Sequence, residues 1–222
     1  MKYDWILFDI DETLLRFNSY DALQFLFSSL HTPFTEVDFL SYEAKNKLLW
    51  ESYQNGHITI KQLQHDRFSA LGERFNKNPL DLNATFLEAI SHVSMPLDGA
   101  INLLDTLKGK AKLGVITNGF TATQEKRIIN NGMHHHFDFI VTSESAGVAK
   151  PQPAIFDHAF SLMANPNREK VLMIGDTLES DILGGINAGI HTCWLNPYKK
   201  IAPDHITPHF EITSLPELEN IL

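Results

Sequence analysis

The chain has 222 residues, more than a typical single domain of about 150 residues and too few for two, so one domain with a compact insertion is expected. Hydrophobic residues make up 43% and charged residues 20% of the sequence, which excludes a disordered or low-complexity protein. The 18 Lys and Arg residues against 27 Asp and Glu residues give a formal net charge of −9, which argues against nucleic-acid polymers and anionic membranes as partners.

Cysteine content and the amino terminus indicate a reducing environment. Cys193 is the only cysteine, so an internal disulfide and a thiolate metal cluster are both excluded. The first apolar run stops at Asp9 and is too short for a signal peptide. No stretch approaches the roughly 20 apolar residues of a membrane span. We therefore expect a cytoplasmic protein. We also expect a monomer or a weak homodimer.

The amino-terminal half predicts one strand followed by a block of helices. The apolar run 5–8 ends at Asp9, as a short buried strand does. About 100 residues then show Phe, Leu, Trp and Tyr at three- and four-residue spacings, with breaks at turn and helix-start signals. The predicted helical segments are 19–30, 35–54, 59–75 and 79–92.

The second half alternates short strands with helices. Its predicted strands are 112–116, 137–141, 171–174 and 191–195. The helical segments between and before them are 99–108, 121–132, 152–164 and 180–188. Such alternation is typical of βαβ units, so the fold class is α/β with a parallel sheet into which the helical block is inserted.

Polar residues follow the predicted strands at the edge where open parallel sheets bind ligands. Together they provide carboxylates, a hydroxyl, an amide and an ammonium group, which suit a hard divalent cation and a phosphoryl group. The residues are Asp9 and Asp11 after the first strand, Thr117 and Asn118 after the second, Lys150 after the third, and Asp176 and Asp181 after the fourth.

Each of these residues also has an ordinary structural interpretation. An aspartate at a strand end is usually a turn or cap residue, and most lysines lie in solvent. Asp9 can instead attack phosphorus as a nucleophile, and Asp11, two residues later, can serve as acid and then base. Thr117 and Asn118 can cap a helix whose start also binds an anion. Because these residues follow successive strands in one consistent order, we favour the functional interpretation.

These motifs resemble those of the haloacid dehalogenase (HAD) superfamily of phosphohydrolases. The four motifs are Phe8-Asp9-Ile10-Asp11-Glu12-Thr13-Leu14, Ile116-Thr117-Asn118-Gly119, Lys150-Pro151 and Gly175-Asp176-Thr177-Leu178-Glu179-Ser180-Asp181. The resemblance implies a Rossmann-like parallel-sheet core formed by residues 1–16 and 96–222. It also implies an inserted α-helical cap at 17–95 that selects the substrate.

The resemblance implies a role for each motif residue. It makes Asp9 the nucleophile and Asp11 the acid and base, with phosphate held by Thr117, Asn118 and Lys150. It implies Mg²⁺, with Mn²⁺ as a substitute. The implied ligands are Asp9, Asp176 and the backbone carbonyl of Asp11, while Asp181 orients a metal ligand or metal-bound water.

Within the superfamily the chain resembles bacterial pyrimidine 5′-nucleotidases. That implies a phosphatase for UMP, dUMP and dTMP with a house-cleaning role against non-standard pyrimidine nucleotides. A phosphatase for a sugar phosphate or phosphoglycolate shares the same core and stays open as an alternative. A dehalogenase has no leaving alkoxide for Asp11 to protonate. A phospho-accepting or binding module of similar fold is the non-enzymatic alternative.

Two further groups of side chains have competing interpretations. The aromatic residues Phe17, Tyr20, Trp50 and Tyr53 of the insertion can stack on a base, although aromatic residues at helical spacing more often form a core. The run 134–136 contains three histidines. We expect these adjacent side chains to point in different directions in an exposed loop, without a metal.

Overall fold

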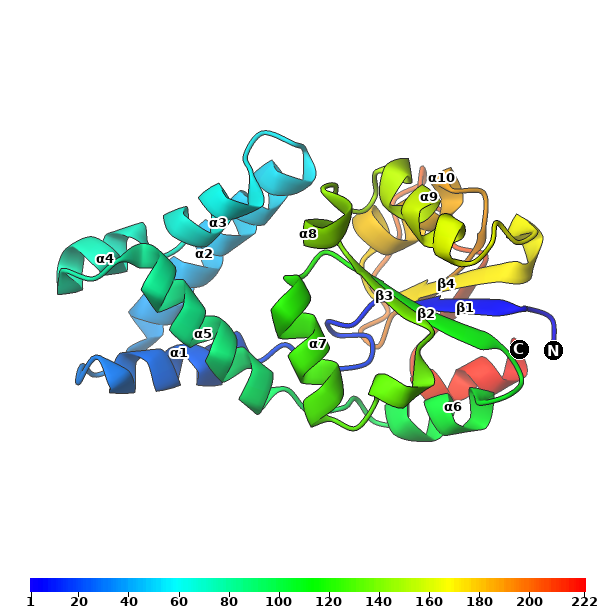
Figure 1. Cartoon of the computed structure of the whole chain (residues 1–222), viewed down its shortest axis with the longest axis horizontal. Coiled ribbons are helices and arrows are strands. Elements are labelled where there is room, and N and C mark those ends of the chain that lie inside the picture. Colours follow the sequence, from blue (N-terminus) through cyan, green and yellow to red (C-terminus); the bar gives the residue numbers. More distant parts are fainter. The chain divides into compact units, whose positions relative to one another are not determined.

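The computed structural model describes all 222 residues and divides into two compact units (Figure 1). The core unit comprises Met1–Arg16 and Met95–Leu222, and the helical unit comprises Phe17–Ser94. The second boundary lies one residue before the position expected from the sequence. None of the helices combines the length and the apolar character needed to cross a membrane.

The core unit contains a six-stranded sheet in the order β3-β2-β1-β4-β5-β6, and every neighbouring pair is parallel. The predicted α/β class is thereby confirmed. The strands are β1 (Trp5–Phe8), β2 (Lys112–Thr117), β3 (Phe139–Thr142), β4 (Val171–Gly175), β5 (His191–Leu195) and β6 (Phe210–Ile212). The sequence did not predict β6, because its three residues include a central Glu and form no apolar run.

β1 lies in the middle of the sheet, and its side chains alternate between two hydrophobic clusters. Ile6 and Phe8 pack in the cluster that contains Leu104, whereas Leu7 packs in the cluster that contains Phe156. Successive residues of a strand point to opposite faces, so both faces of the sheet are buried. Burial on both faces explains why the strands appear in the sequence as continuous apolar runs.

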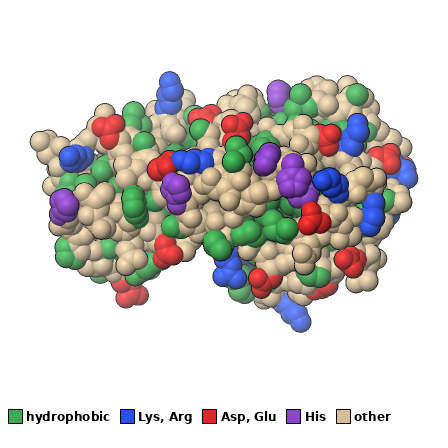
Figure 2. All heavy atoms as spheres, turned by 60° about the horizontal axis from the view of Figure 1, so that its bottom comes forward, with side chains coloured by type: hydrophobic (Ala, Val, Ile, Leu, Met, Phe, Trp, Pro, Cys, Tyr) green, Lys and Arg blue, Asp and Glu red, His purple; other side chains and the backbone are tan.

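Helices cover both faces of this sheet, with α6 and α9 on opposite sides (Figure 1). The α-helices are α6 (Ala100–Leu107), α7 (Thr121–Asn130), α8 (Ser143–Ala146), α9 (Pro153–Leu162) and α10 (Leu183–Asn187). Helical segments of other types are η1 (His134–His136), η2 (Arg168–Lys170), η3 (Leu178–Ile182) and η4 (Leu215–Asn220). On the face drawn in Figure 2, acidic and basic side chains occur in small mixed groups.

The helical unit consists of five α-helices, and all but α4 begin at an Asn or Thr side chain that caps the first turn. Thr35 and Thr59 each form a reciprocal capping box, with Asp38 and Gln62 respectively, and Asn78 accepts a bond from the first turn of the last helix. The helices are α1 (Ser19–Ser29), α2 (Glu36–Gln54), α3 (Ile60–Asp66), α4 (Ser69–Phe75) and α5 (Pro79–Val93).

Aromatic side chains form the core of the helical unit. The rings of Tyr42, Phe68 and Phe86 lie 5.3–5.5 Å apart between centroids. Phe68 is fully buried at the break between α3 and α4, so the segment predicted as one helix is two. The ring of Tyr20, considered for stacking on a base, lies 5.0 Å from that of Phe34, and its side chain is partly exposed. Its stacking on a base stays a prediction.

The two segments that link the units are paired inside the core unit. The amide of Arg16 donates to the carbonyl of Met95 at 2.9 Å, and the amide of Leu97 donates to the carbonyl of Leu14 at the same distance. Leu15 and Pro96 also form an antiparallel bridge. The chain therefore leaves and re-enters the core unit through one short two-stranded connection, directly after the segment that contains Asp9 and Asp11.

Candidate active site

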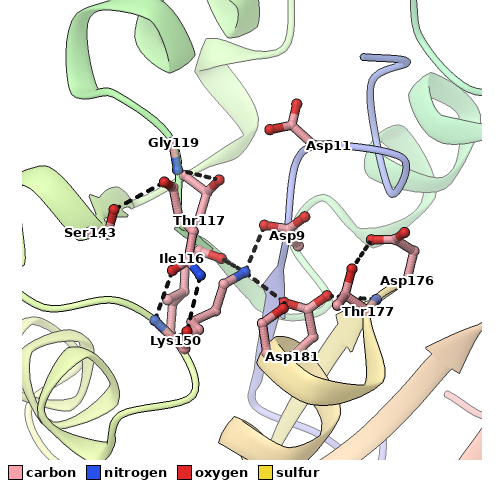
Figure 3. Close-up of polar contacts among 12 residues, drawn as sticks. Asp9, Asp11, Ile116, Thr117, Gly119, Ser143, Lys150, Asp176, Thr177 and Asp181 are labelled. Carbon is pink, nitrogen blue, oxygen red and sulfur yellow. Dashed lines mark hydrogen bonds and ion pairs between the residues drawn. The ribbon is translucent and has the colours of Figure 1, made fainter. Parts of the chain in front are cut away.

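The buried ammonium group of Lys150 lies at the centre of the candidate site (Figure 3). Its Nζ atom is 2.6 Å from Oδ1 of Asp9 and 2.7 Å from Oδ1 of Asp181. It also donates to the carbonyl oxygen of Ile116 at 2.6 Å. Asp9 follows β1, Ile116 lies at the end of β2, and Asp181 lies in η3 beyond β4. Lys150 thus joins three separate strand ends.

The carboxylates around Lys150 carry more negative charge than this one ammonium group offsets. Burial raises the pKa of Asp9 to about 7 against the opposing effect of Lys150, and the charge of Asp181 adds to the rise. Burial, together with the charges of Asp181 and Asp9, raises the pKa of Asp176 to about 8. Burial also opposes the charged form of Lys150, but Asp181 and Asp9 outweigh it and hold its pKa above the ordinary value.

The same carboxylates have the chemistry and spacing of a metal site. Asp9, Asp176 and Asp181 each offer one oxygen, and these oxygens all lie within 4.8 Å of one another. Carboxylate oxygens are the ligands that Mg²⁺ and Mn²⁺ prefer. A divalent cation would also oppose the burial and the repulsion that raise the pKa of Asp9 and of Asp176. The donor set therefore fits the cation that the motifs imply.

The close approach of Asp181 depends on a glycine in the neighbouring strand. A Cβ atom on Gly175 would lie 2.2 Å from Oδ2 of Asp181, which is an impossible contact. The same carboxylate accepts from the amide of Thr177 at 3.0 Å and from the hydroxyl of Ser180 at 3.2 Å. These bonds fix Asp181 against Lys150, and the glycine of this motif leaves the space for it.

Asn118 fixes the backbone of Lys150. Its Oδ1 accepts from the Lys150 amide at 2.7 Å, and its Nδ2 donates to the Lys150 carbonyl at 3.0 Å. Both ends of the side-chain amide are therefore engaged inside the protein. The prediction that Asn118 also holds phosphate stays a prediction. Thr117, also predicted to hold phosphate, is buried beside it and accepts from the amide of Gly119 at 3.3 Å.

The Asp11 side chain is held apart from the other carboxylates. Figure 3 shows it directed away from Asp9. It forms an ion pair with Arg127 and accepts from Nε2 of Gln124 at 3.1 Å. Gln124 also donates to Oγ1 of Thr117 at 3.2 Å and accepts from Arg127 at 2.6 Å. Asp11 is thus anchored to α7, and its carboxylate is not part of the clustered oxygens.

Gln124 and Arg127 were not predicted from the sequence. Both side chains are almost completely buried. They lie three residues apart on α7, so they share one face of that helix. Arg127 also donates to the carbonyl of Arg16 at 3.2 Å, at the end of the first core segment. Two long polar residues on the same face as the buried Ile128 were the available signal. The sequence alone did not show which side of α7 faces the site.

Comparisons with known proteins agree with this fold and site. A family model of haloacid dehalogenase-like hydrolases matches residues 3–189. Pyrimidine 5′-nucleotidase YjjG of Escherichia coli is 51% identical over 222 residues, covering 100% of this chain and 99% of that protein. Pyrimidine 5′-nucleotidase PynA of Streptococcus pneumoniae is 33% identical, covering 100% of this chain and 96% of that protein.

A solved structure is similar over both units. It is that of the HAD-hydrolase YfnB from Bacillus subtilis bound to magnesium, with 34% sequence identity and a TM-score of 0.89. The similarity covers 100% of this chain and 99% of that chain. The family match over most of the core unit and the full-length relatives give the same assignment. The chain belongs to the haloacid dehalogenase-like hydrolase family.

Proposed function

We propose that the protein is a Mg²⁺-dependent phosphatase that hydrolyses pyrimidine nucleoside 5′-monophosphates. The contact of Lys150 with both Asp9 and Asp181, beside Asp176, carries the phosphoryl-transfer chemistry. The substrate class rests on the two pyrimidine 5′-nucleotidases, which match the chain over its whole length, including the helical unit. UMP, dUMP and dTMP are the proposed substrates, and removal of non-standard pyrimidine nucleotides is the proposed role.

The reaction has two displacement steps. A carboxylate oxygen of Asp9 attacks the phosphorus atom, the bond from phosphorus to O5′ breaks, and the Asp11 carboxyl group gives its proton to O5′. Asp11, now a carboxylate, takes a proton from a water molecule that attacks the aspartyl-phosphate. The bond from Asp9 to phosphorus then breaks, and inorganic phosphate leaves. Each proton that Asp11 gives in the first step is recovered in the second.

The other residues orient the reacting groups and offset their charge. Lys150 fixes the Asp9 carboxylate and, with Thr117, holds phosphoryl oxygens. Mg²⁺, for which Mn²⁺ can substitute, would be held by Asp9, Asp176 and the backbone carbonyl of Asp11, and would offset the negative charge of the phosphoryl group. Asp181 would orient a ligand of that ion through its place beside Lys150. The enzyme acts in the cytoplasm as a monomer or a weak homodimer.

A substrate screen tests this proposal. Phosphate release by the purified full-length chain with Mg²⁺ should show the highest kcat/KM for UMP, dUMP and dTMP. Purine nucleotides, sugar phosphates and phosphoglycolate should be poorer substrates. Asp9→Asn should abolish release from all of them, which guards against a contaminating phosphatase. A preference for phosphoglycolate or a sugar phosphate would contradict the substrate class, and release by Asp9→Asn at the wild-type rate would contradict the mechanism.

A further inference from the structure

The rings of two adjacent histidines in η1 lie close together and are tilted against each other. The ring centroids of His135 and His136 are 4.0 Å apart with an interplanar angle of 37°. The expectation that neighbouring histidines here point in different directions is therefore wrong for this pair. It holds better for His134, whose ring is 5.5 Å from that of His135 and nearly perpendicular to it at 79°.

An aspartate from another element completes a group of three ligand atoms. Asp105 lies in α6, and its Oδ1 is 3.5 Å from Nε2 of His136. One ligand atom from each of Asp105, His135 and His136 lies within 4.8 Å of the other two. A separation of 3.5 Å is too long for a good hydrogen bond. It matches the spacing of about 3.4 Å between two ligands of a tetrahedral zinc ion.

We propose that Asp105, His135 and His136 form a second metal site, which binds one borderline transition-metal cation of the zinc type. Imidazole nitrogen favours zinc, nickel and copper ions over Mg²⁺, whereas the group of Asp9, Asp176 and Asp181 (the Asp9 cluster) contains only oxygen ligands. The two sites therefore select different metals. His136 provides a fixed ligand because its side chain is 2% exposed, and Asp105, 62% exposed, leaves the ion open to water on the outer side.

The surroundings of the pair keep His136 available to a metal. Burial, and then the charge of His135, lowers the pKa of His136 against the opposing effect of Asp105. A metal binds the neutral imidazole, which a lowered pKa favours. Lys108 and His134 lower the same pKa. Figure 2 shows histidine side chains gathered with basic and acidic neighbours on one face. The positive charge of Lys108 should weaken a bound cation, so its removal should strengthen binding.

Calorimetric titration of the untagged full-length chain with ZnCl₂ tests the site. Saturating Mg²⁺ is present throughout, so that zinc does not report on the Asp9 cluster. We expect one zinc ion per chain. His135→Ala and Asp105→Asn should each weaken binding by about tenfold or more, because each removes a direct ligand. The matched control His134→Ala removes the neighbouring histidine of the same turn and should leave the affinity unchanged. Lys108→Ala should tighten it.

A second readout separates loss of the site from loss of the fold. Zinc should raise the melting temperature of the wild type and of His134→Ala in Mg²⁺, because it binds the native state. It should not raise that of His135→Ala, whose melting temperature without zinc should equal the wild-type value, since this side chain is exposed. The site is refuted if His135→Ala and Asp105→Asn bind zinc as the wild type does. It is also refuted if Asp176→Asn abolishes the binding.

Discussion

Lys150 is buried between the carboxylates of Asp9 and Asp181. The buried ammonium group and the buried carboxylates therefore offset one another's charge. Lys150→Met keeps much of the side-chain length but removes the charge. Breaking a buried ion pair from one side typically costs about 3–5 kcal/mol, because the remaining charges stay buried. We expect the free energy of unfolding, measured by urea denaturation without Mg²⁺, to fall by about that amount. Phosphatase activity should be lost as well.

Lys110→Met provides the matched control for this change. Lys110 is exposed, and its loss should leave both the urea transition and the activity near the wild-type values. A Lys150→Met chain as stable as the Lys110→Met chain would contradict the ion-pair interpretation. Such a result would mean that the carboxylates of Asp9 and Asp181 tolerate the loss of the ammonium group without cost.

The reactivity of the Cys193 thiol reports whether the middle of β5 is buried. Burial raises the pKa of its thiol to about 12, and the charge of Glu217 adds to the effect. Only the thiolate reacts with alkylating reagents, so the folded chain should react very slowly near neutral pH. The rate should rise with pH while the fold persists, because the thiolate fraction does. Equal rates for the native and the urea-unfolded chain at neutral pH would refute this prediction.

At the scale of single elements, α7 links the candidate acid and base to the rest of the site. Arg127 and Gln124 hold Asp11, and Arg127 also binds the backbone of Arg16. We expect Arg127→Met to lower kcat about 10- to 100-fold with a smaller effect on KM, because general acid-base catalysis contributes on that order or more. The pH–rate profile should also change.

Lys126→Met removes the same charge one position earlier on α7, from a side chain that is only partly buried. It should leave kcat and the pH–rate profile unchanged. If Arg127→Met lowers activity only in proportion to its fraction of unfolded chain, with an unshifted pH–rate profile, Arg127 has a structural role alone. Recovery of the profile by Arg127→Lys would support the role in holding Asp11.

The sequence predicted the strands of the sheet better than the helices. β1 and β4 are buried on both faces, so each appears in the sequence as a continuous apolar run. β1 is followed by Asp9, and β4 ends at Gly175 directly before Asp176, so the positions of both strands were evident. β6 was missed because edge strands need only one buried face and its middle residue is polar. The break between α3 and α4 was missed because Phe68 continues the helical spacing although it lies in the break.

The candidate site was predictable where a residue directly follows a strand. Asp9 and Asp176 are positioned by their strands, so their place in the chain indicates their place in space. Gln124 and Arg127 were not predictable in this way, because a helix can present either face and its orientation depends on packing. The side-chain contacts of Asn118 with the Lys150 backbone were hidden for a similar reason, since they join residues 32 positions apart.

At the scale of the whole molecule, metal binding should be linked to stability. Mg²⁺ at the Asp9 cluster would bind the native chain and oppose the burial and the repulsion that raise the pKa of Asp176. At a concentration 100 times the Kd, such binding stabilises a protein by about 2.7 kcal/mol. Chelation should therefore lower the melting temperature of the wild type. In Asp176→Asn, Mg²⁺ and chelator should give nearly the same melting temperature, and an undiminished Mg²⁺ effect in that variant would contradict the assignment of the ligands.

The division into two units also follows from the sequence in part. A helical block with its own aromatic core was predictable, because its spacing differs from the strand pattern around it. The paired link between Leu14 and Leu97 was not, because it depends on backbone bonds between segments more than 80 residues apart. That link lies close in sequence to Asp11, so the connection to the helical unit and the candidate acid share one stretch of chain.

Chemical trapping of the phosphorylated enzyme tests the central claim most directly. The full-length chain is mixed with dTMP and Mg²⁺, quenched during turnover, reduced with borohydride and digested for mass spectrometry. Borohydride converts an aspartyl-phosphate into homoserine, and we predict homoserine at position 9 and at no other aspartate. An unmodified residue 9 under conditions of active turnover, or homoserine at another position, would show that Asp9 does not carry the phosphoryl group.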